Sequence, residues 1–470
     1  MWEEKEASVA LWMAVWGVLG CQPEEPEAAS LDTAPFGAIT WHQDIAPIVT
    51  GHCNGCHQEN RIAGHLPWTD PSVVGQAADW IVSVTKERSM PPFFASSTDT
   101  CAPPLTYDQD ARLSIEELEL IAQWAADDAP IGDPSTPAPL PQPPTLMLDD
   151  WSNEFHPNEP YSPPWIESEN GPIQDLRRCW SFDLGLTDTG YVDAIEVLPG
   201  NLEIVHHVRI DLSDGPPKEE RDADGSFDCE ATQFGQRAAV WVPGTKPYQT
   251  PPGSGLELAA GTHLIMNIHY HLVDDQEQED LTRLRVRYLP SKPDRIVRNI
   301  KVGNDHVRRA DGTGLQPGPY DADGPEFLIP AGEASHVETM TLRVPDDSPP
   351  MNIWMVGHHM HYVGVEAKLT LQRAVTDPNY GDESCLLEVT PWDFDWQLFY
   401  TYKDPTLQFV PLAAGDALTL SCTYNNTWTN ERWAQVLALE GITELPDVAL
   451  SDGSLSEMCA ALVGVVMDTP

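Results

Sequence analysis

The pattern of apolar and polar residues divides the chain into a short helical part and a long part made of strands. From about residue 149 onward, apolar residues recur in short runs that are broken by Gly, Pro and Asp. Residues 282–289 alternate apolar side chains with three arginines, and residues 365–371 alternate in the same way. Such alternation is typical of antiparallel strands with one face on the core and the other in water. Many of these strands at short spacing predict a mainly β protein built from β-sandwiches, with almost no helix after residue 149.

A helix is predicted in the N-terminal part. Ser114 and Glu117 have the spacing of a capping box, which indicates a helix that begins there and runs to about Asp127. Its apolar face consists of Leu118, Ile121, Ala122 and Ala125. We expect residues 39–133 to form a small all-α domain in which Trp124 belongs to the core.

Residues 134–148 contain six prolines, so they cannot form a helix or a central strand. We expect a semi-rigid, extended linker between the helical domain and the β part. As a hypothesis, such a linker allows the helical domain to dock on the rest of the chain and to leave it.

The first residues resemble a bacterial lipoprotein signal. Residues 9–20 are apolar but too few to span a bilayer, and they end at Cys21. In lipoproteins this cysteine is lipidated, so the resemblance implies a signal peptide over residues 1–21 and a lipid anchor at Cys21. Residues 1–6 are net acidic and so depart from the usual basic start, which leaves the true start codon open. Residues 22–38, rich in Pro, Glu and Ala, are expected to be a disordered tether. These features predict an exported protein that is anchored by lipid in the periplasm or at the cell surface.

The charge of the chain limits its partners. Twenty-six basic residues stand against 73 acidic ones, which gives a net charge of -47. Such a surface repels nucleic acid and anionic membranes, so we exclude nucleic-acid binding and expect membrane contact only through the lipid anchor.

Residues 53–57 read Cys-Asn-Gly-Cys-His, a motif typical of covalent haem c attachment. Cys53 and Cys56 would form the thioethers, and His57 would ligate the iron. A thioredoxin-like dithiol would need a βαβ pattern, and a zinc knuckle would need a second close cysteine pair; neither is present. Met90, in a proline-flanked loop, is the expected sixth ligand. The competing residues are His42, His52 and His65. Residues 39–133 thus resemble a class I cytochrome c.

Histidines recur in the β part in a specific order: His206 and His207 are adjacent, His269 stands on a predicted strand, and His359 and His361 share one face of another. His263 and His271 have the same parity as His269, and spacing alone does not exclude His271. A methionine, Met458, follows just before a cysteine. This set resembles the copper type II, ascorbate-dependent monooxygenases, which include the peptidylglycine α-hydroxylating and dopamine β-monooxygenases.

The resemblance implies two consecutive jelly-roll-like β-sandwich domains, over residues 149–292 and 293–470, each with one copper on the surface that faces the other. One copper would be held by His206, His207 and His269, and the catalytic copper by His359, His361 and Met458. Adjacent strand residues normally face opposite ways, so His206 and His207 would need an irregular backbone to share one ion. His358 is an extra histidine outside the pattern.

Nine cysteines fit an oxidising compartment. With Cys21 assigned to lipid and two cysteines to haem, six remain. The resemblance implies the pairs Cys422–Cys459 and Cys179–Cys229. Cys101 and Cys385 lie in different predicted domains, and pairing or two free thiols are equally compatible with the sequence.

The activity implied is hydroxylation of a C–H bond in a small organic substrate by O2, with two copper ions and one haem c as cofactors. Electrons would come from an ascorbate-like reductant or a redox protein, through the fused haem. Peptide-amidating members carry an arginine where this chain has Gly357 and a tyrosine where it has Leu462, so peptide amidation is not expected. The alternative is a non-catalytic haem and copper electron-transfer or copper-binding lipoprotein. Substrate, donor and oligomeric state are not readable from the sequence.

Overall fold

The computed structural model describes residues 38–469 except 60–62, 65, 109, 145, 169–170, 174, 230–233, 273–274, 322–323 and 454. The predicted signal peptide with Cys21 and the candidate ligand His65 lie outside the described residues. Among the helices described, none has both the length and the apolar character needed to cross a membrane.

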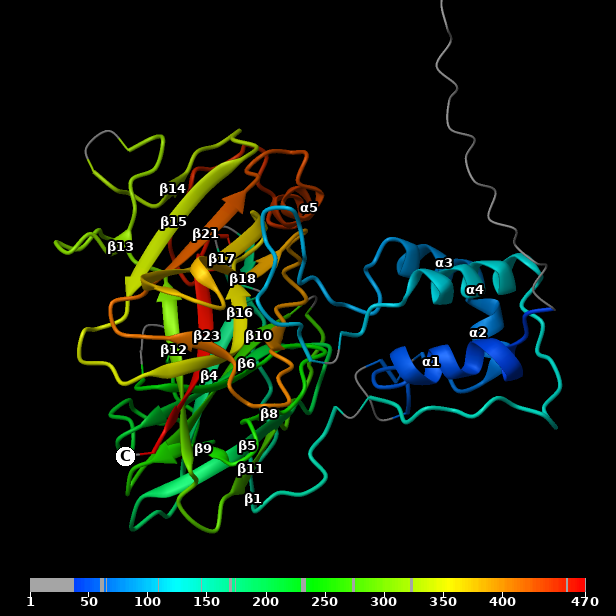
Figure 1. The fold of residues 1–470 in the computed structure, drawn as a ribbon, viewed down its shortest axis with the longest axis horizontal. Helices are drawn as coiled ribbons and strands as arrows, with labels where there is room; N and C mark the ends of the chain where they lie inside the picture. The colour runs from blue at the N-terminus through cyan, green and yellow to red at the C-terminus, as the bar shows by residue number, and fades with distance from the viewer. Residues whose placement is uncertain are drawn as a thin grey trace, which may run out of the picture.

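A small helical domain precedes the β part, as the sequence predicted (Figure 1). Its elements are η1 (Trp41–Ile45), α1 (Ala46–His52), α2 (Pro71–Gln76), α3 (Ala78–Lys86) and α4 (Ile115–Ala126). Ser114 and Glu117 form the predicted capping box at the start of α4. Trp124 is fully buried in a core separate from that of the β part, and its indole N–H donates to the Pro130 carbonyl.

The rest of the chain is mainly β, as predicted, and its strands form three large sheets. The four-stranded sheet runs in the order β4 (Asp175–Asp183), β10 (His263–His271), β6 (Val205–Ser213) and β7 (Arg237–Trp241). The five-stranded sheet runs in the order β13 (Gly314–Leu315), β15 (His336–Arg343), β21 (Ala417–Tyr424), β17 (Gly364–Asp377) and β18 (Gly381–Val389). The ten-stranded sheet contains β1 (Asn153–Phe155), β11 (Arg283–Tyr288), β5 (Gly190–Leu198), β9 (Ser254–Leu258), β12 (Arg295–Gly303), β23 (Ala460–Asp468), β16 (Met351–His359), β19 (Phe399–Thr401), β8 (Tyr248–Gln249) and β20 (Val410–Leu412). Two small pairs complete the set: β2 (Ile166–Ser168) with β3 (Gly171–Ile173), and β14 (Leu328–Ile329) with β22 (Val448–Ala449).

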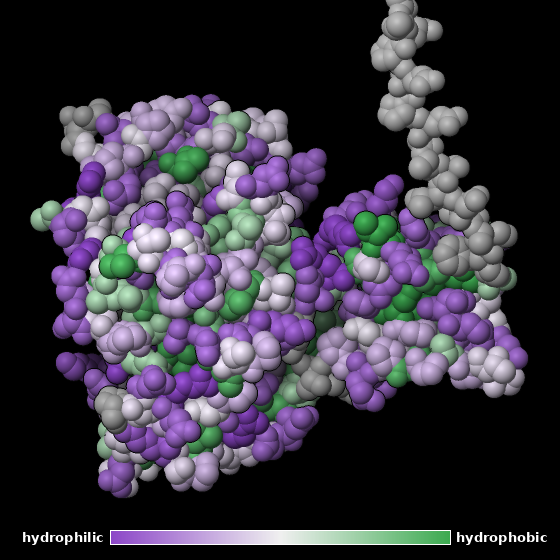
Figure 2. All heavy atoms as spheres, viewed as in Figure 1, coloured by the Kyte–Doolittle hydropathy of each residue, from purple (hydrophilic) through white to green (hydrophobic). Residues whose placement is uncertain are grey.

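The ten-stranded sheet joins both halves of the β part. Strand β9 of the first half pairs in parallel with β12 of the second, so backbone hydrogen bonds cross the predicted boundary. Buried residues from all three large sheets belong to one hydrophobic cluster. The two halves therefore share a sheet and a core, and the visible surface around them is mostly hydrophilic (Figure 2).

Two local details add to the expected pattern. Helix α5 (Glu431–Leu439) lies in the part where almost no helix was expected; Asn430 caps it, and its Trp433 and Leu437 are buried. In addition, one arginine of β11, Arg285, does not face water. Arg285 is 8% exposed and pairs with Glu154 and Glu196, because neighbouring strands supply carboxylates on that face.

A segment of the helical domain crosses to the β part. We call residues 93–108, between α3 and α4, the strap; it is the blue segment that reaches toward α5 in Figure 1. It pairs with β18 through Ala95 and Val389, and with the chain beyond β19 through Tyr107 and Tyr402. Strands β18 and β19 lie at the edges of two sheets, so the strap covers backbone groups that would otherwise be open to pairing with other chains.

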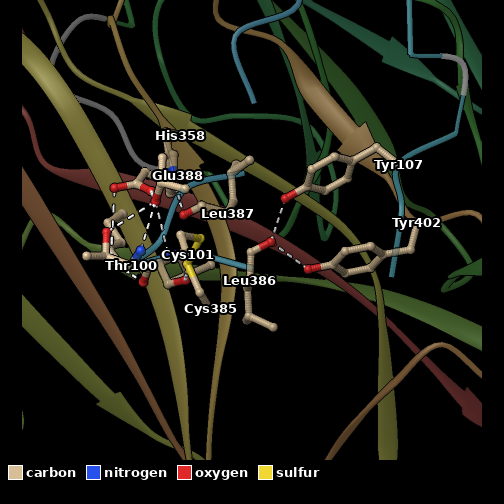
Figure 3. The surroundings of a disulfide bond; sticks show 12 residues. Thr100, Cys101, Tyr107, His358, Cys385, Leu386, Leu387, Glu388 and Tyr402 are labelled. Atoms are coloured by element: carbon tan, nitrogen blue, oxygen red, sulfur yellow. Dashed lines mark hydrogen bonds and ion pairs between the residues drawn. A yellow bond between two sulfur atoms is a disulfide. The ribbon is translucent and has the colours of Figure 1, made fainter. Parts of the chain in front are cut away.

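The strap is also attached covalently. Cys101 forms a disulfide with Cys385 of β18, 284 residues away (Figure 3). Nearby, the hydroxyls of Tyr107 and Tyr402 both donate to the Leu386 carbonyl, at 2.7 Å each. The disulfide answers the question that the sequence left open for this pair. It also argues against a helical domain that leaves the β part, since that domain is connected to it at two places.

The Cys101–Cys385 disulfide predicts a specific result on denaturing gels. A protease recognition sequence placed within residues 134–148 and then cut should leave two fragments that migrate as one species without reductant and as two with it. Cys101→Ser is the control, and its fragments should separate under both conditions. Separation of the unsubstituted fragments without reductant would contradict the disulfide.

Candidate metal centre

Three histidines meet on the face of the four-stranded sheet that points away from its core. On β6, His207 and Arg209 alternate with the buried Val208 and Ile210. The pairing of β10 with β6 shifts register after His269, which leaves His206 as an extra residue in the ladder. This bulge is the irregular backbone that adjacent ligands need, because it turns His206 to the side of His207.

The ring nitrogens of these residues converge. His207 Nδ1 lies 3.1 Å from His206 Nδ1 and 3.3 Å from His269 Nδ1. Two nitrogens bound to one ion at about 2.0–2.1 Å with near-tetrahedral angles have this separation. His206, His207 and His269, the three-histidine cluster, could therefore hold one metal ion.

Asp175 orients the third histidine. Its carboxylate lies 2.8 Å from His269 Nε2, which fixes that nitrogen as the donor and leaves Nδ1 for a metal. His271 Nδ1 contacts the same carboxylate at 3.0 Å, so it acts as a neighbour of Asp175 and not as the third ligand. His263 lies at the other end of β10, where its ring contacts Ser181. The structure thus identifies His269 as the candidate ligand among His263, His269 and His271, a choice that the alternation of strand residues did not allow.

Burial sets the protonation of this cluster. Desolvation, together with repulsion between the rings, lowers the pKa of His206 and of His207 well below the usual value, and desolvation lowers that of His269. Burial opposes ionisation of Asp175 too, but hydrogen bonds from His269 and His271 hold its pKa well below its ordinary range. The imidazoles are therefore neutral, which is the form that binds metals.

A second group, the His-Met cluster of His359, His361 and Met458, lies where β16 ends and just before β23. The ring centroids of His359 and His361 are 5.2 Å apart. His359 Nδ1 contacts Gln397 Oε1, and His361 Nδ1 contacts the Ser456 carbonyl at 2.9 Å. Both rings thus use Nδ1 for protein contacts and keep Nε2 for a ligand.

Glu457 holds this cluster together. Its side chain is fully buried and accepts hydrogen bonds from four backbone N–H groups, those of His361, Val363, Gly364 and Met458, at 2.7–3.1 Å. The carboxylate therefore ties the turn after His361 to the segment that carries Met458. Burial raises the pKa of Glu457 to about 7, although the four hydrogen bonds act in the opposite direction. The sequence pattern assigned no role to Glu457, and only the structure gives it one.

The two clusters face each other. The ring centroids of His207 and His359 are 6.4 Å apart, and Phe394 stacks on His206 at 4.6 Å. His207, His359 and Met458 line one cavity of about 320 Å³. The groups that the sequence assigned to two separate sandwiches thus border a common space.

Two residues of β16 beside the His-Met cluster, Gly357 and His358, depart from the pattern of the family that the sequence resembles. His358 is buried on strand β16, and its Nε2 contacts the Leu387 carbonyl at 3.4 Å, so it lies outside the His-Met cluster as predicted from the sequence. At Gly357, a Cβ would lie 2.4 Å from the ring of Phe399. Phe399 thus occupies the space of any side chain at 357, which includes the arginine of peptide-amidating enzymes.

The Cys-x-x-Cys-His motif, residues 53–57, lies just after α1. The N–H groups of Cys56 and His57 both donate to the Cys53 carbonyl, so the motif forms a tight turn. His57 is buried and stacks on Trp68 at 4.0 Å, and its Nδ1 contacts the Leu66 carbonyl at 3.2 Å. Neither Cys53 nor Cys56 takes part in the disulfides of the described chain.

Of the candidates for the sixth position, Met90 follows α3 and its N–H donates to the Val84 carbonyl. Both ring nitrogens of His52 contact other groups, the Ala111 carbonyl and Glu117. His42 lies in η1 and is partly buried. The geometry therefore disfavours His52 and leaves Met90 as the expectation.

The remaining predicted pairs are present as disulfides. Cys179 bonds to Cys229, and Cys422 on β21 bonds to Cys459 beside Met458. The Tyr424 hydroxyl also donates to the Met458 carbonyl at 2.8 Å. The methionine segment is thus held by a disulfide, a tyrosine and Glu457.

Comparison with known proteins adds no identity. No protein-family model matches the chain, and no curated protein does. Among solved structures, the top component of cowpea mosaic virus is 9% identical, covers 63% of this chain and 90% of its own, and has a TM-score of 0.23. A Paenibacillus xanthan lyase is 11% identical, covers 73% of this chain and 28% of its own, and has a TM-score of 0.16. Likenesses at this level carry no argument about fold or function.

The role of Glu457 predicts a large effect on stability. Each buried donor left without a partner costs about 1–3 kcal/mol, so we expect Glu457→Ala to lower the free energy of unfolding by at least about 3 kcal/mol. Glu457→Gln keeps one acceptor oxygen and should lose less. Urea unfolding followed by tryptophan fluorescence measures both, with Glu444→Ala, at an exposed glutamate, as the control. Equal stability of the two alanine variants would refute the role.

The geometry of the three-histidine cluster predicts that His269, and not His271, is a metal ligand. The alternation of residues along a strand does not distinguish the two. His269→Ala should lower the affinity for Cu(II) at this cluster at least about tenfold, because it removes a direct ligand. His271→Ala should lower it less, since it changes only a neighbour of Asp175. Competition with a chromophoric chelator measures both affinities. A larger loss in His271→Ala would reverse the assignment.

Proposed function

We propose that the protein is a copper-dependent monooxygenase that hydroxylates a C–H bond of a small organic substrate with O2. The observation that carries the proposal is the pair of clusters on one cavity: three imidazoles with converging Nδ1 atoms, opposite two imidazoles and a thioether. Nitrogen with thioether sulfur is a donor set that favours Cu(I), whereas zinc prefers nitrogen with thiolate or carboxylate. Copper bound at both clusters would supply the one-electron redox chemistry and the activation of O2.

The overall reaction converts one C–H bond, one O2, two electrons and two protons into one C–OH group and one water. In this reaction the protein's own residues fix geometry and access. Gln397 and the Ser456 carbonyl orient the two imidazoles of the His-Met cluster, and Glu457 holds Met458 beside them. Asp175 keeps His269 in the tautomer that presents Nδ1.

We further propose that the two electrons enter one at a time from an external donor, an ascorbate-like reductant or a redox protein, through a haem c in the helical domain. Cys53, Cys56, His57 and Met90 would hold that haem. The strap supports this route, because it begins three residues after Met90 and reaches the strands beside the His-Met cluster. Phe93 contacts Tyr400 at 5.1 Å between ring centroids, and Tyr400 pairs with Val356 of β16. A permanent connection of this kind keeps donor and acceptor domains close.

The disulfides of the described chain indicate an oxidising environment outside the cytoplasm. We propose in addition that the chain is exported to the periplasm or the cell surface of a bacterium and anchored by lipid at Cys21. The short apolar segment that ends at this cysteine supports that proposal.

Metal content tests the proposed function directly. Protein matured with haem c, reconstituted with copper and dialysed should retain two copper ions and one iron per chain. Met458→Ala should retain about one copper, because a soft ligand of one site is lost while the three-histidine cluster is intact. One iron with no retained copper would end the monooxygenase proposal. Full loading without O2 consumption in the presence of reductant and candidate substrates would instead support an electron-transfer protein.

A further inference from the structure

The cavity between the two clusters has a charge opposite to that of the chain. Among the residues that the structure describes, four cations line it: Arg177 of β4, Arg209 of β6, Arg237 of β7 and Lys301 of β12. Two carboxylates line it as well, Asp211 and Asp452. The cavity thus carries two positive charges in excess, in a chain whose net charge is -47. Cations gathered in a cleft attract anions selectively, even where the surrounding surface repels them.

These cations are not all neutralised by the protein. Arg237 pairs with the buried Asp211 at 2.9 Å. Arg177 donates to the backbone carbonyl of Asp452 at 3.0 Å and not to its carboxylate. The Arg209 Nε–H is buried and has no hydrogen-bond partner among the described groups. Lys301 stands at the exposed mouth of the cavity and forms no ion pair with any described residue.

Arg209 is the cation of this cavity whose buried Nε–H lacks a hydrogen-bond acceptor among the described groups. It lies close to two other cations of the cavity, Arg237 and Arg177, as well as to the carboxylate of Asp211. A guanidinium group stays charged in proteins, so the neighbouring cations repel it. An unpaired guanidinium donor held away from water is costly, and a bound anion would offset both the repulsion and the missing hydrogen bond.

The same cavity has an apolar wall and borders the His-Met cluster. Val242, Phe399 and Leu462 line it together with His359 and Met458. Its volume of about 320 Å³ suits a small molecule with one charged end. A guanidinium group matches the geometry of both carboxylates and phosphates, so either group could sit at the charged end.

We propose that this cavity binds a small organic anion, whose carboxylate or phosphate is held by Arg209 and Lys301 while its apolar part lies against Phe399 and Val242 beside His359 and Met458. Identification of this anion as the substrate rests on the proposed function; its binding does not. The position that carries the arginine of peptide-amidating enzymes is Gly357 here, so the anion is held by different residues from different strands.

Calorimetry on the full-length protein tests the proposal, with and without copper. The probes are benzoate and phenyl phosphate, which share the ring and differ in the anionic group, and benzamide, which is the neutral match of benzoate. We expect at least one anion to bind, and benzamide to bind at least about tenfold more weakly, because it lacks the charge-assisted hydrogen bonds. The stronger of the two anions tells which group the cavity prefers.

Variants locate the binding. Lys301→Gln and Arg209→Gln should each weaken binding of the preferred anion about tenfold, the loss of one charge-assisted contact. Arg298→Gln is the matched control, since Arg298 lies on the same strand, is exposed and does not line the cavity. Lys301 is at the exposed mouth, so its replacement should leave the fold intact even where that of Arg209 does not.

Three outcomes would overturn the proposal: no binding of either anion, equal binding of benzamide and benzoate, or equal effects of Arg298→Gln and Lys301→Gln. Anion binding at this cavity in a protein that retains no copper would support this inference while the proposed function failed. Copper loading and O2 consumption without anion binding would support the proposed function and refute this inference.

Discussion

The buried carboxylate of Glu457 is the interaction on which the candidate centre depends. Four backbone N–H groups from two segments almost a hundred residues apart donate to its two oxygens. A carboxylate is costly to bury, and hydrogen bonds to the charged form offset that cost. The turn after β16 and the segment before β23 are thereby held in one arrangement. With the adjacent Cys422–Cys459 disulfide, this holds the Met458 segment beside the turn that carries His361.

The shared ten-stranded sheet positions the three-histidine cluster opposite the His-Met cluster. Because β9 pairs with β12, the two halves of the β part share one sheet, and backbone hydrogen bonds hold them together. The polar face of the four-stranded sheet is then turned toward the end of β16, which brings His207 near His359. Along the strands, residues of that face alternate with residues of a mostly apolar face, so the residues that border the cavity are those that the core excludes. Histidines and arginines gather there for the same reason, and metal binding and anion binding become properties of one space.

The strap changes how the helical domain relates to the rest. A proline-rich linker alone suggests a domain that docks and leaves. The strap adds buried Phe93 and Phe94 to the main core, covers two sheet edges and forms a disulfide. Backbone pairing and apolar burial at this contact mean that the domain is built into the β part.

Local features of the protein were readable from the sequence, because they depend on residues close together in the chain. The capping box of α4, the alternation of the strands and the Cys-x-x-Cys-His turn belong to this group, whereas His361 lies in the turn after β16 and not on the strand that was expected. Features that join distant segments were decided by the tertiary structure. The bulge that turns His206, the choice of His269 over His271, the four donors of Glu457, the carboxylates around Arg285 and the bond between Cys101 and Cys385 all arise where separate strands meet. A residue's local pattern states which way it points, but its partner is chosen by packing and pairing across the whole fold, which no short stretch of sequence contains.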